Sequence, residues 1–424
     1  YIPAPEGDPE AGTQVLISTI DYNEYVGRIG VGKVDNGKIA VNQEVMLMNH
    51  HEPDKKKKVK ISKLYEFDGL NKVEVAEANI GSIVAISGIA DIHIGDTLCD
   101  LENPDPIPFQ KISEPTIAMN FMVNDSPLAG QEGKYITSRH LRDRLYRELN
   151  TDVSLRVEDT DSPDCFKVAG RGELHLSVLI ENMRREGYEF AVSKAEVLYR
   201  TDERGKKLEP MEIAYVDVPD EFSGSVIQRL SERKGELQGM SPTSDGNTRL
   251  EFEIPARGLI GFRTALLSAT RGTGISSSIS AGYAPWAGAI TIRQNGSMVS
   301  DRKGIATPYA MQRLQARGNF FVEPQSPVYE GQVVGVNNKP DELDVNITLA
   351  KHMTNMRSST ADVLETLTPP IKMSLEESLD FANEDECVEV TPESIRVRKI
   401  ILGREDWYKW RAKQRRQNAA QQGK

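Results

Sequence analysis

One order of strand-like and helix-like segments occurs twice in succession in this chain, and it constrains the fold more than any other feature. The first copy runs from Thr116 to Val192 and the second from Glu212 to Tyr283. Within the first copy, leucines recur at every fourth position over Ser138 to Leu149, as in a helix with one buried face. Strand, helix, strand, strand, helix, strand is the order of a ferredoxin-like unit. The sequence therefore predicts two ferredoxin-like βαββαβ domains, joined only by Tyr199 to Lys207.

The first hundred residues have a different pattern, in which short β-branched strands alternate with glycine-marked turns. Asn36-Gly37 lies between two apolar runs and is typical of a hairpin turn, because both residues readily adopt positive φ angles. The strand-like run from Ser82 to Ser87 has a glycine on each side. No helical period separates these strands, which favours a closed antiparallel β-barrel. Three prolines within Glu102 to Pro108 end the region as a linker.

Beyond about Ala289 the pattern is weaker. Strand-like pieces surround a polar loop, at 290–294, 328–336, 343–349 and 394–400. Ser374 and Glu377 have the spacing of a capping box, which predicts the start of a helix. The stretch after Asp406 is expected to be helical or disordered. We therefore expect a multidomain α+β chain with an antiparallel β-barrel at 1–108, ferredoxin-like domains at 109–198 and 199–287, and a mixed, mostly-β C-terminal domain with a basic tail at 288–424.

Composition excludes several classes of protein. The chain has 424 residues, of which 27% are charged, and no apolar run approaches the ~18 residues of a membrane-spanning helix. Three widely spaced cysteines (Cys99, Cys165 and Cys387) do not suit a disulfide framework, so we expect a cytoplasmic protein. The chain begins with neither Met nor a signal sequence, and we interpret it as a processed or truncated piece. We expect a monomer that makes no membrane contact.

Two fragments resemble parts of a nucleotide site, but both lack what the chemistry needs. Gly130 to Lys134 has two residues between its first glycine and Gly-Lys, where a phosphate-binding loop has four, and Tyr135 replaces the Ser or Thr that would bind magnesium. Asn338 to Asp341 matches an N-K-x-D pattern that reads guanine, but without a phosphate loop we interpret it as an exposed turn. The six histidines and three cysteines do not have metal-ligand spacing, so no metal site is predicted.

Glu173 and His175 lie two residues apart at the start of a predicted helix. Side chains at that spacing diverge on a helix, because neighbours on one face are three or four residues apart. We therefore interpret the two residues as the start of a helix rather than as an acid/base pair. No catalytic residue is predicted in this chain.

Two basic segments are candidates for nucleic-acid contact despite the net charge of −11. The first is the run of Lys55, Lys56, Lys57 and Lys58, which is either a solvated hairpin tip or a phosphate contact. The second is the tail from Trp407, in which aromatic residues interleave with six basic residues and no acid. That composition suits base stacking and phosphate contact, with a solubilising tail as the alternative. The basic residues that we single out in the tail are Arg411, Arg415 and Arg416.

The polar loop from Ala350 to Ala361 is a third candidate. It contains no acid, and its side chains supply many hydrogen-bond donors. The residues that carry this character include Lys351, His352, Thr354, Asn355, Arg357 and Ser358. Such a loop suits the sugar and phosphate edges of RNA, although polar surface loops without a ligand are also common.

Several motifs resemble those of one protein family. Arg28-Ile-Gly-Val-Gly-Lys-Val34, together with Ile94-Gly-Asp-Thr97, resembles the barrel that follows the GTP-binding domain in translational GTPases. Gly170-Arg-Gly-Glu-Leu-His-Leu176 is similar to the signature of their third domain. Pro255-Ala-Arg-Gly-Leu-Ile-Gly-Phe-Arg263, with Thr270-Arg-Gly-Thr-Gly274, resembles the fifth-domain segment of the BipA/TypA ribosome-associated GTPases. The resemblance covers nearly the whole chain.

The resemblance implies the ribosome-binding portion of a translational GTPase. A member of this family binds the A-site and intersubunit region of the ribosome, contacts rRNA of both subunits and A-site tRNA, and hydrolyses GTP there with Mg. It is linked to stress response, virulence and assembly of the large ribosomal subunit. The GTP-binding domain would lie upstream of Tyr1, so this chain is expected to hold no cofactor and to have no GTPase activity.

The same resemblance implies which residues contact RNA. By this match, ribosome or tRNA contact is carried onto Lys351, His352, Thr354, Asn355, Met356, Arg357 and Ser358, and also onto Lys55 to Lys58. All but the lysine run belong to the polar loop of the C-terminal domain. The expected RNA contact is therefore concentrated in one loop.

Three alternatives are weighed against this reading. Elongation factor G would carry another large domain between the two ferredoxin-like units, so the short connection excludes it. A LepA-like elongation factor remains an alternative, against which the Arg-Gly-Leu-Ile-Gly-Phe segment argues. A small-molecule-binding regulatory protein built on the paired ferredoxin-like units is a second alternative. It predicts a pocket between those units and no dependence on RNA.

Overall fold

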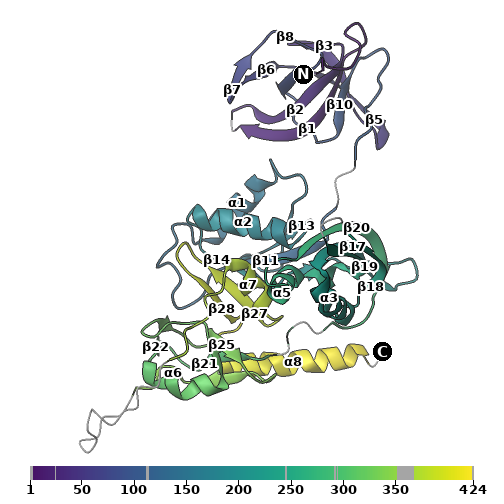
Figure 1. Ribbon diagram of the computed structural model, residues 1–424. Helices are drawn as coiled ribbons and strands as arrows, with labels where there is room; N and C mark the ends of the chain where they lie inside the picture. Colours follow the sequence, from purple (N-terminus) through teal and green to yellow (C-terminus); the bar gives the residue numbers. More distant parts are fainter. Residues whose placement is uncertain are drawn as a thin grey trace, which may run out of the picture. The chain divides into compact units, whose positions relative to one another are not determined.

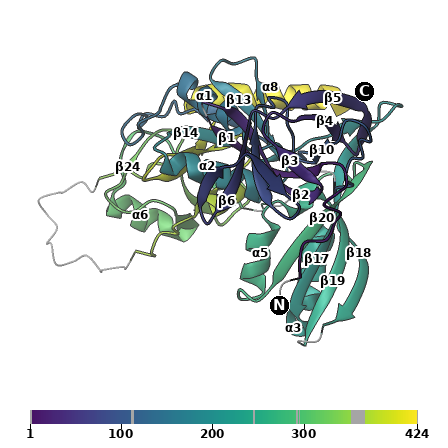
Figure 2. The same ribbon diagram turned by 90° about the horizontal axis from the view of Figure 1, so that it is seen from above.

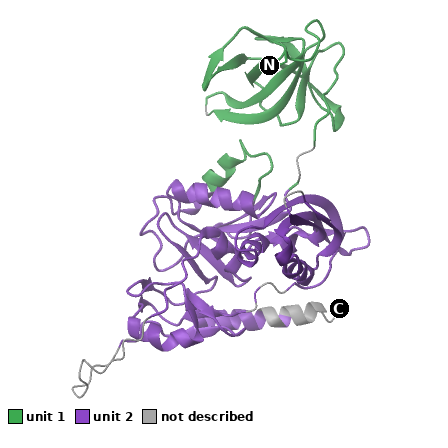
Figure 3. Cartoon of the chain, in the orientation of Figure 1, with its two compact units in different colours: residues 1–114, 142–157 green, residues 115–141, 158–424 purple. Residues whose placement is uncertain are grey.

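The computed structural model describes residues 3–23, 25–110, 114–243, 246–290, 293, 295–350 and 367–422. The chain forms two compact units, one of residues 1–114 and 142–157 and the other of residues 115–141 and 158–424 (Figure 3). Helix α1 (Ser138–Glu148) is divided between them. Among the described helices, none combines the length and the apolar character that crossing a membrane would require.

The first unit is built mainly from one antiparallel sheet of eight strands (Figure 1). In sheet order these are β5 (Glu52–Lys60), β4 (Glu44–Asn49), β10 (Asp96–Cys99), β1 (Gln14–Asn23), β2 (Gly27–Asn36), β9 (Ile83–Ser87), β6 (Lys63–Asp68) and β7 (Asn71–Glu74). A separate pair consists of β3 (Lys38–Ala40) and β8 (Glu77–Asn79). The buried side chains of both sheets form one core, which includes Val34, Ile39, Leu64, Ala78 and Ile86.

The expected closed barrel is corrected to an open sheet. The two strands at its ends, β5 and β7, each pair with one neighbour in the described structure and not with each other. All four residues of β7 are exposed, and so are all residues of β5 except Val59. These ends therefore have little apolar surface with which to close against each other, whereas the strands between them cover the core.

The predicted hairpin across Asn36-Gly37 is wrong as a strand pairing. Strand β2 pairs with β1 and β9, while the following strand β3 pairs with β8 in the second, smaller sheet. Gly37 does have the positive φ that the turn signal predicts, at +65°. Its amide donates to the carbonyl of Asp8 (2.9 Å), so the turn packs against the N-terminal segment and leads the chain out of the main sheet.

The first ferredoxin-like pattern is confirmed in its elements and their order. They are β11 (Ile117–Val123), α1, β12 (Arg156–Asp159), β13 (Cys165–Gly170), α2 (Glu173–Arg185) and β14 (Phe190–Ser193). The strands lie in the order β12-β13-β11-β14, with the short β15 (Glu196–Val197) also paired with β11. Helix α2 forms where expected because its apolar residues recur at helical spacing, and Leu176, Leu179, Ile180 and Met183 are all buried.

The second copy has the same strand order. Its elements are β16 (Arg200–Thr201), β17 (Lys207–Pro219), α3 (Asp220–Glu232), β18 (Glu236–Pro242), β19 (Asn247–Pro255), α4 (Ala256–Leu259), α5 (Phe262–Ala269) and β20 (Ile275–Pro285). Strand β17 lies between β19 and β20, and β18 is an edge. Helices α3 and α5 lie on the same face of this sheet (Figure 2), where Leu230 and Leu266 pack in one core with Phe252.

The C-terminal segment forms a small sheet and several short elements. They are β21 (Ser297–Ser300), β22 (Gly304–Ile305), α6 (Pro308–Leu314), the 3₁₀ turn η1 (Gln315–Arg317), β23 (Gly318–Phe320), β24 (Pro327–Val328), β25 (Val333–Asn337), β26 (Leu343–Val345), α7 (Leu375–Phe381), β27 (Glu386–Val390), β28 (Ile395–Lys399) and α8 (Arg404–Gln422). The order β23-β25-β21-β26 includes one parallel pair, β21 with β26, and β22 pairs with β24. The capping box at α7 is confirmed, because Glu377 N donates to Ser374 Oγ (3.2 Å) and Ser374 N donates to Glu377 Oε2 (2.8 Å).

Strands β27 and β28 do not belong to that small sheet. Strand β27 pairs antiparallel with β14, with Phe190 opposite Val390 and Val192 opposite Val388. The C-terminal segment therefore extends the sheet of the first ferredoxin-like unit. The α+β class with mostly antiparallel sheets is confirmed, while the partition into four domains remains a prediction. The strand expected at 290–294 falls largely outside the described residues.

Candidate nucleic-acid interface

The four lysines predicted to contact RNA in the first unit lie on the exposed edge strand β5. Three of them already have carboxylate partners: Lys55 Nζ lies 2.8 Å from Glu52, Lys57 Nζ 2.6 Å from Asp91, and Lys58 Nζ 2.6 Å from Glu44. Such exposed ion pairs contribute little to stability, so a phosphate could replace the carboxylate at little cost. In the described structure, however, neighbouring carboxylates offset the positive charge of three of these four lysines.

A hollow beside β5 has the same mixed character. Its volume is about 830 Å³, and its lining includes Lys56, which is exposed and forms no ion pair with a described residue. Asp54 and Asp96 line it together with His51. The carboxylates offset the lysines, so charge alone does not distinguish this face as a site for an anion.

The residues predicted with most support, Lys351, His352, Thr354, Asn355, Met356, Arg357 and Ser358, lie outside the described residues. The residues on both sides of this segment are described, and helix α6 holds them. Thr307, the N-cap of α6, donates from Oγ1 to the carbonyl of Leu349 (2.6 Å). Gln315, the C-cap, accepts from the amide of Thr368 through Oε1 (3.3 Å). The described residues on either side of 351–366 are therefore held at the two ends of α6.

Helix α6 also adds basic side chains that the sequence patterns did not indicate. Arg313 near its end and Arg317 in η1 are both exposed, and the guanidinium of Arg313 lies 5.7 Å from the ring centre of Tyr309. Helix α6 itself has only seven residues, too few for a clear apolar period. Its one local signal is Thr307-Pro308, because threonine accepts from the Ala310 amide (3.1 Å) and proline is favoured in the first turn.

The tail is helical in the structure, as part of α8. Its first turns are held by residues that come earlier in the C-terminal segment. Trp407 is only 5% exposed, and its Nε1 donates to Asp385 Oδ2 (3.2 Å). Tyr408 Oη donates to Asp344 Oδ2 (3.1 Å). The Trp407 ring is therefore not available to stack on a base, and it has a structural role that composition alone did not reveal.

The three tail arginines singled out from the sequence differ in their surroundings. Arg411 lies over the Trp407 ring (4.8 Å to its centre) and 3.6 Å from Glu342. Arg416 is exposed, while the side chain of Arg415 lies outside the described residues. Of the described pair, Arg416 is thus the more accessible to a phosphate.

A buried lysine explains why Trp407 is anchored at this place. Lys399 Nζ lies 2.9 Å from Asp385, 3.0 Å from Glu342 and 3.2 Å from Glu386, and 5.0 Å from the Trp407 ring centre. Burial lowers the pKa of Lys399, but the three carboxylates outweigh that effect and raise it overall. The ammonium group is therefore charged, and it links β28 to the start of α8.

The fragment that resembles a phosphate-binding loop is occupied by the chain's own carboxylate. The amides of Gly130 and Gly133 donate to Glu189 on either side of its carboxylate, at 2.8 and 3.0 Å. A side-chain carboxylate thus takes the place where a phosphate loop would hold its ligand. The interpretation of Gly130 to Lys134 as a non-nucleotide segment fits this geometry.

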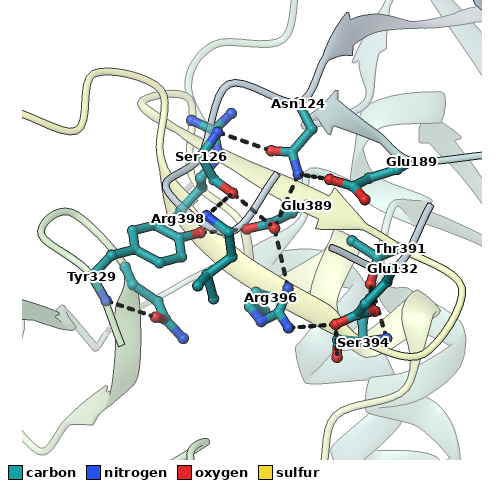
Figure 4. A network of polar contacts seen from close by, with 12 residues as sticks. Asn124, Ser126, Glu132, Glu189, Tyr329, Glu389, Thr391, Ser394, Arg396 and Arg398 are labelled. Atoms are coloured by element: carbon teal, nitrogen blue, oxygen red, sulfur yellow. Dashed lines mark hydrogen bonds and ion pairs between the residues drawn. The ribbon is translucent and has the colours of Figure 1, made fainter. Parts of the chain in front are cut away.

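This carboxylate belongs to a larger polar network that joins the first ferredoxin-like unit to the C-terminal segment (Figure 4). At its centre, the fully buried Glu389 accepts from Ser126 Oγ (3.0 Å), Arg396 Nη1 (3.1 Å) and Tyr329 Oη. Asn124 Nδ2 bridges Glu389 (3.1 Å) and Glu189 (2.8 Å). Burial and the charge of Glu389 raise the pKa of Tyr329, so the phenol remains a donor.

Comparison with known proteins identifies the segments one by one. Residues 27–99 match the family of elongation factor Tu domain 2, residues 206–293 the elongation factor G C-terminus, and residues 295–404 the TypA/BipA C-terminal domain. The last match includes α6, residues 351–366, and strands β27 and β28.

Whole-chain relatives point the same way. The chain is 48% identical to a protein of Synechocystis sp. over 94% of its own length, and 48% identical to one of Bacillus subtilis over 96%. It is 46% identical to a protein of Salmonella typhimurium over 96% of its length. All three relatives are named large ribosomal subunit assembly factor BipA, and the chain spans about two thirds of their length, 66%, 66% and 67%. The chain thus belongs to the TypA/BipA family, which confirms the family indicated by its motifs.

Proposed function

We propose that this chain is the ribosome-docking portion of a translational GTPase that acts in assembly of the large ribosomal subunit. The observation that carries the proposal is the identity of 46–48%, over 94–96% of this chain, to relatives named as assembly factors of that subunit. The region matched to the TypA/BipA C-terminal domain includes residues 351–366.

In this proposal, docking takes place at the A-site and intersubunit region in the cytoplasm, with contacts to rRNA of both subunits and to A-site tRNA. The main contact is the segment of Lys351 to Ser358, and the exposed Arg313 of α6 and Arg317 of η1 add positive charge. Arg416 and the lysines of β5 contribute at the periphery. Support comes from the anchoring of Leu349 and Thr368, on either side of residues 351–366, to one short helix.

GTP hydrolysis belongs to the whole protein in this proposal, with GTP and Mg bound by residues outside this chain. This chain alone neither binds nor hydrolyses GTP. The occupied amides of Gly130 and Gly133 support that view, as does the exposed position of Asn338 to Asp341. Hydrolysis would alter how the parts of the protein are oriented and release it from the ribosome. Its role in stress-responsive translation and virulence would follow from this cycle.

Sedimentation of the 424-residue chain with large ribosomal subunits over a salt series tests the proposal. We expect association to weaken steeply as salt rises, because contacts with phosphates release counterions. The variant K351A/R357A should sediment less with the subunits than the parent chain. The matched control is K63A/R249A, which also removes two exposed basic residues but lies on β6 and β19.

Three outcomes would contradict the proposal. Association that is absent or independent of salt would contradict phosphate-driven docking. Equal loss in K351A/R357A and its control would show that only overall charge matters and would remove the loop from the interface. Tight binding of GTP by this chain, measured by calorimetry, would contradict the assignment of the nucleotide site to other residues.

The alternative of a small-molecule-binding regulator predicts a pocket between the paired ferredoxin-like units. A hollow of about 650 Å³ does lie there, with a lining from α2, α5 and α7 that includes Glu173, Thr264 and Asp380. Membership of the TypA/BipA family favours the ribosomal proposal over both this regulator and the LepA-like alternative. Salt-independent behaviour in the sedimentation experiment would favour the regulator.

A further inference from the structure

Two carboxyl groups from distant parts of the chain meet at the beginning of helix α5. The amide of Gly261, the N-cap of α5, donates to Glu173 Oε2 (3.2 Å). Thr264, in the first turn of the same helix, donates from Oγ1 to Asp380 Oδ2 (3.0 Å). The carboxyl groups of Glu173 and Asp380 also lie within hydrogen-bonding reach of each other. The pair therefore connects α2, α5 and α7, which belong to three different segments of the chain.

A glycine makes this close approach possible. Gly261 has a φ of +67°, a conformation that other residues adopt only with strain. A Cβ atom at this position would lie 3.1 Å from the carboxyl carbon of Asp380. The absence of a side chain thus lets the carboxyl of Asp380 lie against the backbone while the amide still reaches Glu173.

Two carboxyl groups in hydrogen-bond contact cannot both be ionised without strong repulsion. A hydrogen bond between them also needs a proton on one of the two, since ionised carboxylates only accept. Burial, followed by the contact with Asp380, raises the pKa of Glu173 to about 8. One proton is therefore held between the two groups at neutral pH.

Charged groups on each neighbouring element bear on this proton. From the end of α3, the charge of Arg233 favours ionised carboxylates, but its Nη1 is engaged by the carbonyls of Gly258 and Ile260, each at 2.8 Å. The other charged side chains around the hollow are Arg263 from α5 and Glu376 and Glu377 from α7. His175 of α2 is directed elsewhere, because its Nδ1 accepts from the amide of Arg171 (3.3 Å).

We propose that Glu173 and Asp380 share one proton, and that loss of this proton to solvent loosens the junction of α2, α5 and α7. The hollow of about 650 Å³ beside the pair gives water access to it. After the proton has left, two negative charges face each other across the junction, and α7 separates from α2 and α5. The junction is thus a pH-responsive joint that operates just above neutral pH, whether or not the chain binds ribosomes.

Infrared difference spectroscopy of the 424-residue chain tests the shared proton directly. We expect the carbonyl band of a protonated carboxyl group to persist at about pH 7 and to disappear as the pH rises through about 8. E173Q should lack the band, because the carboxyl group with the raised pKa is gone. In D380N the band should disappear at lower pH than in the parent, because the contact with Asp380 no longer adds to the effect of burial. The control E376Q changes another acid of the hollow and should keep it. No protonated carboxyl band in the parent at about pH 7 would overturn the proposal.

Hydrogen exchange at the amides of α7 tests the loosening. Between about pH 6 and about pH 8 we expect exchange in the parent to become faster relative to E173Q, because the closed junction holds a proton that the opened junction releases. The ratio should rise about tenfold per pH unit over this range and level off above about pH 8. D380N provides an independent isostere if E173Q does not fold. Equal exchange in the parent and the folded variant at both pH values would exclude the joint.

Discussion

The two ferredoxin-like units share a strand order but differ in how their sheets end. In the first, β14 is completely buried except for Ser193 and pairs with β27 from the C-terminal segment. In the second, the corresponding strand β20 pairs with β17 alone among the described strands, and most of its residues are exposed. One local pattern thus produces an interior unit and a peripheral unit. The difference shows that the surroundings of a strand are decided by partners far away in the sequence.

The largest effect should come from removing the buried carboxylate of the first unit. In E389A, Tyr329 and Ser126 lose a buried acceptor, and Arg396 keeps only Glu132 (2.9 Å). Each buried group that is left unsatisfied costs about 1–3 kcal/mol in the free energy of unfolding. Urea unfolding followed by circular dichroism would measure the loss. The matched change in the second unit, E253A, removes only the exposed contact with Gln238 and should cost about 0.5 kcal/mol or less. Similar losses in the two variants would contradict the contrast between the units.

A smaller effect is expected from pH. Because the pKa of Glu173 is raised from 4.5 to about 8, the folded chain retains a proton that the unfolded chain releases between those values. Stability is therefore highest below about pH 4.5 for this group, falls as pH rises to about 8, and is level above that. E173Q should flatten this slope, and its stabilising effect relative to the parent should grow as the pH rises towards about 8.

The second ferredoxin-like unit offers a control for this pH dependence of the free energy of unfolding. Burial also raises the pKa of Glu212 in β17, but Glu212 accepts a hydrogen bond from Ser278 and has no carboxyl partner. E212Q should therefore change the slope less than E173Q does. The free energy of unfolding, measured in urea at several pH values, would compare the two. An unchanged slope in E173Q would contradict the raised pKa.

The smallest effect is expected on the exposed face of the second unit. Arg249 forms two hydrogen bonds with Asp217, at 2.7 and 2.6 Å, and lowers the pKa of that carboxyl group. R249A should change the unfolding midpoint little at low salt and still less at high salt, because counterions screen exposed pairs. Thermal unfolding at the two salt concentrations would show this. A large loss that persists at high salt would mean that this face is not peripheral.

The sequence was sufficient wherever a structure depends on near neighbours. The strand expected to open the second copy at Glu212 lies within β17. The predicted start of a helix at Ser374 is confirmed with both hydrogen bonds of its capping box. Helix α2 begins at Glu173, as expected. Each of these features is encoded by residues a few positions apart.

The sequence was insufficient wherever distant residues meet. The pairing of Val192 with Val388 has no local signal, since an apolar strand has the same sequence pattern at the edge of a sheet as in its interior. The role of Glu173 beyond starting a helix depends on Gly261, 88 residues away. The open first sheet could not be told from a barrel, because alternation predicts strands but not whether the last one meets the first. The burial of Trp407 depends in the same way on Asp385.

The pairing of β14 with β27 has a consequence for shortened forms of the chain. A form that ends before residue 386 would leave the backbone groups of Phe190 to Ser193 without their neighbouring strand. An apolar strand with unpaired amides and carbonyls is a template for pairing with another molecule. Such a form should aggregate or exchange strands, even though every element of its ferredoxin-like pattern is present. Strand β27 of the C-terminal segment therefore protects the first ferredoxin-like unit from aggregation, although that unit ends almost two hundred residues before β27.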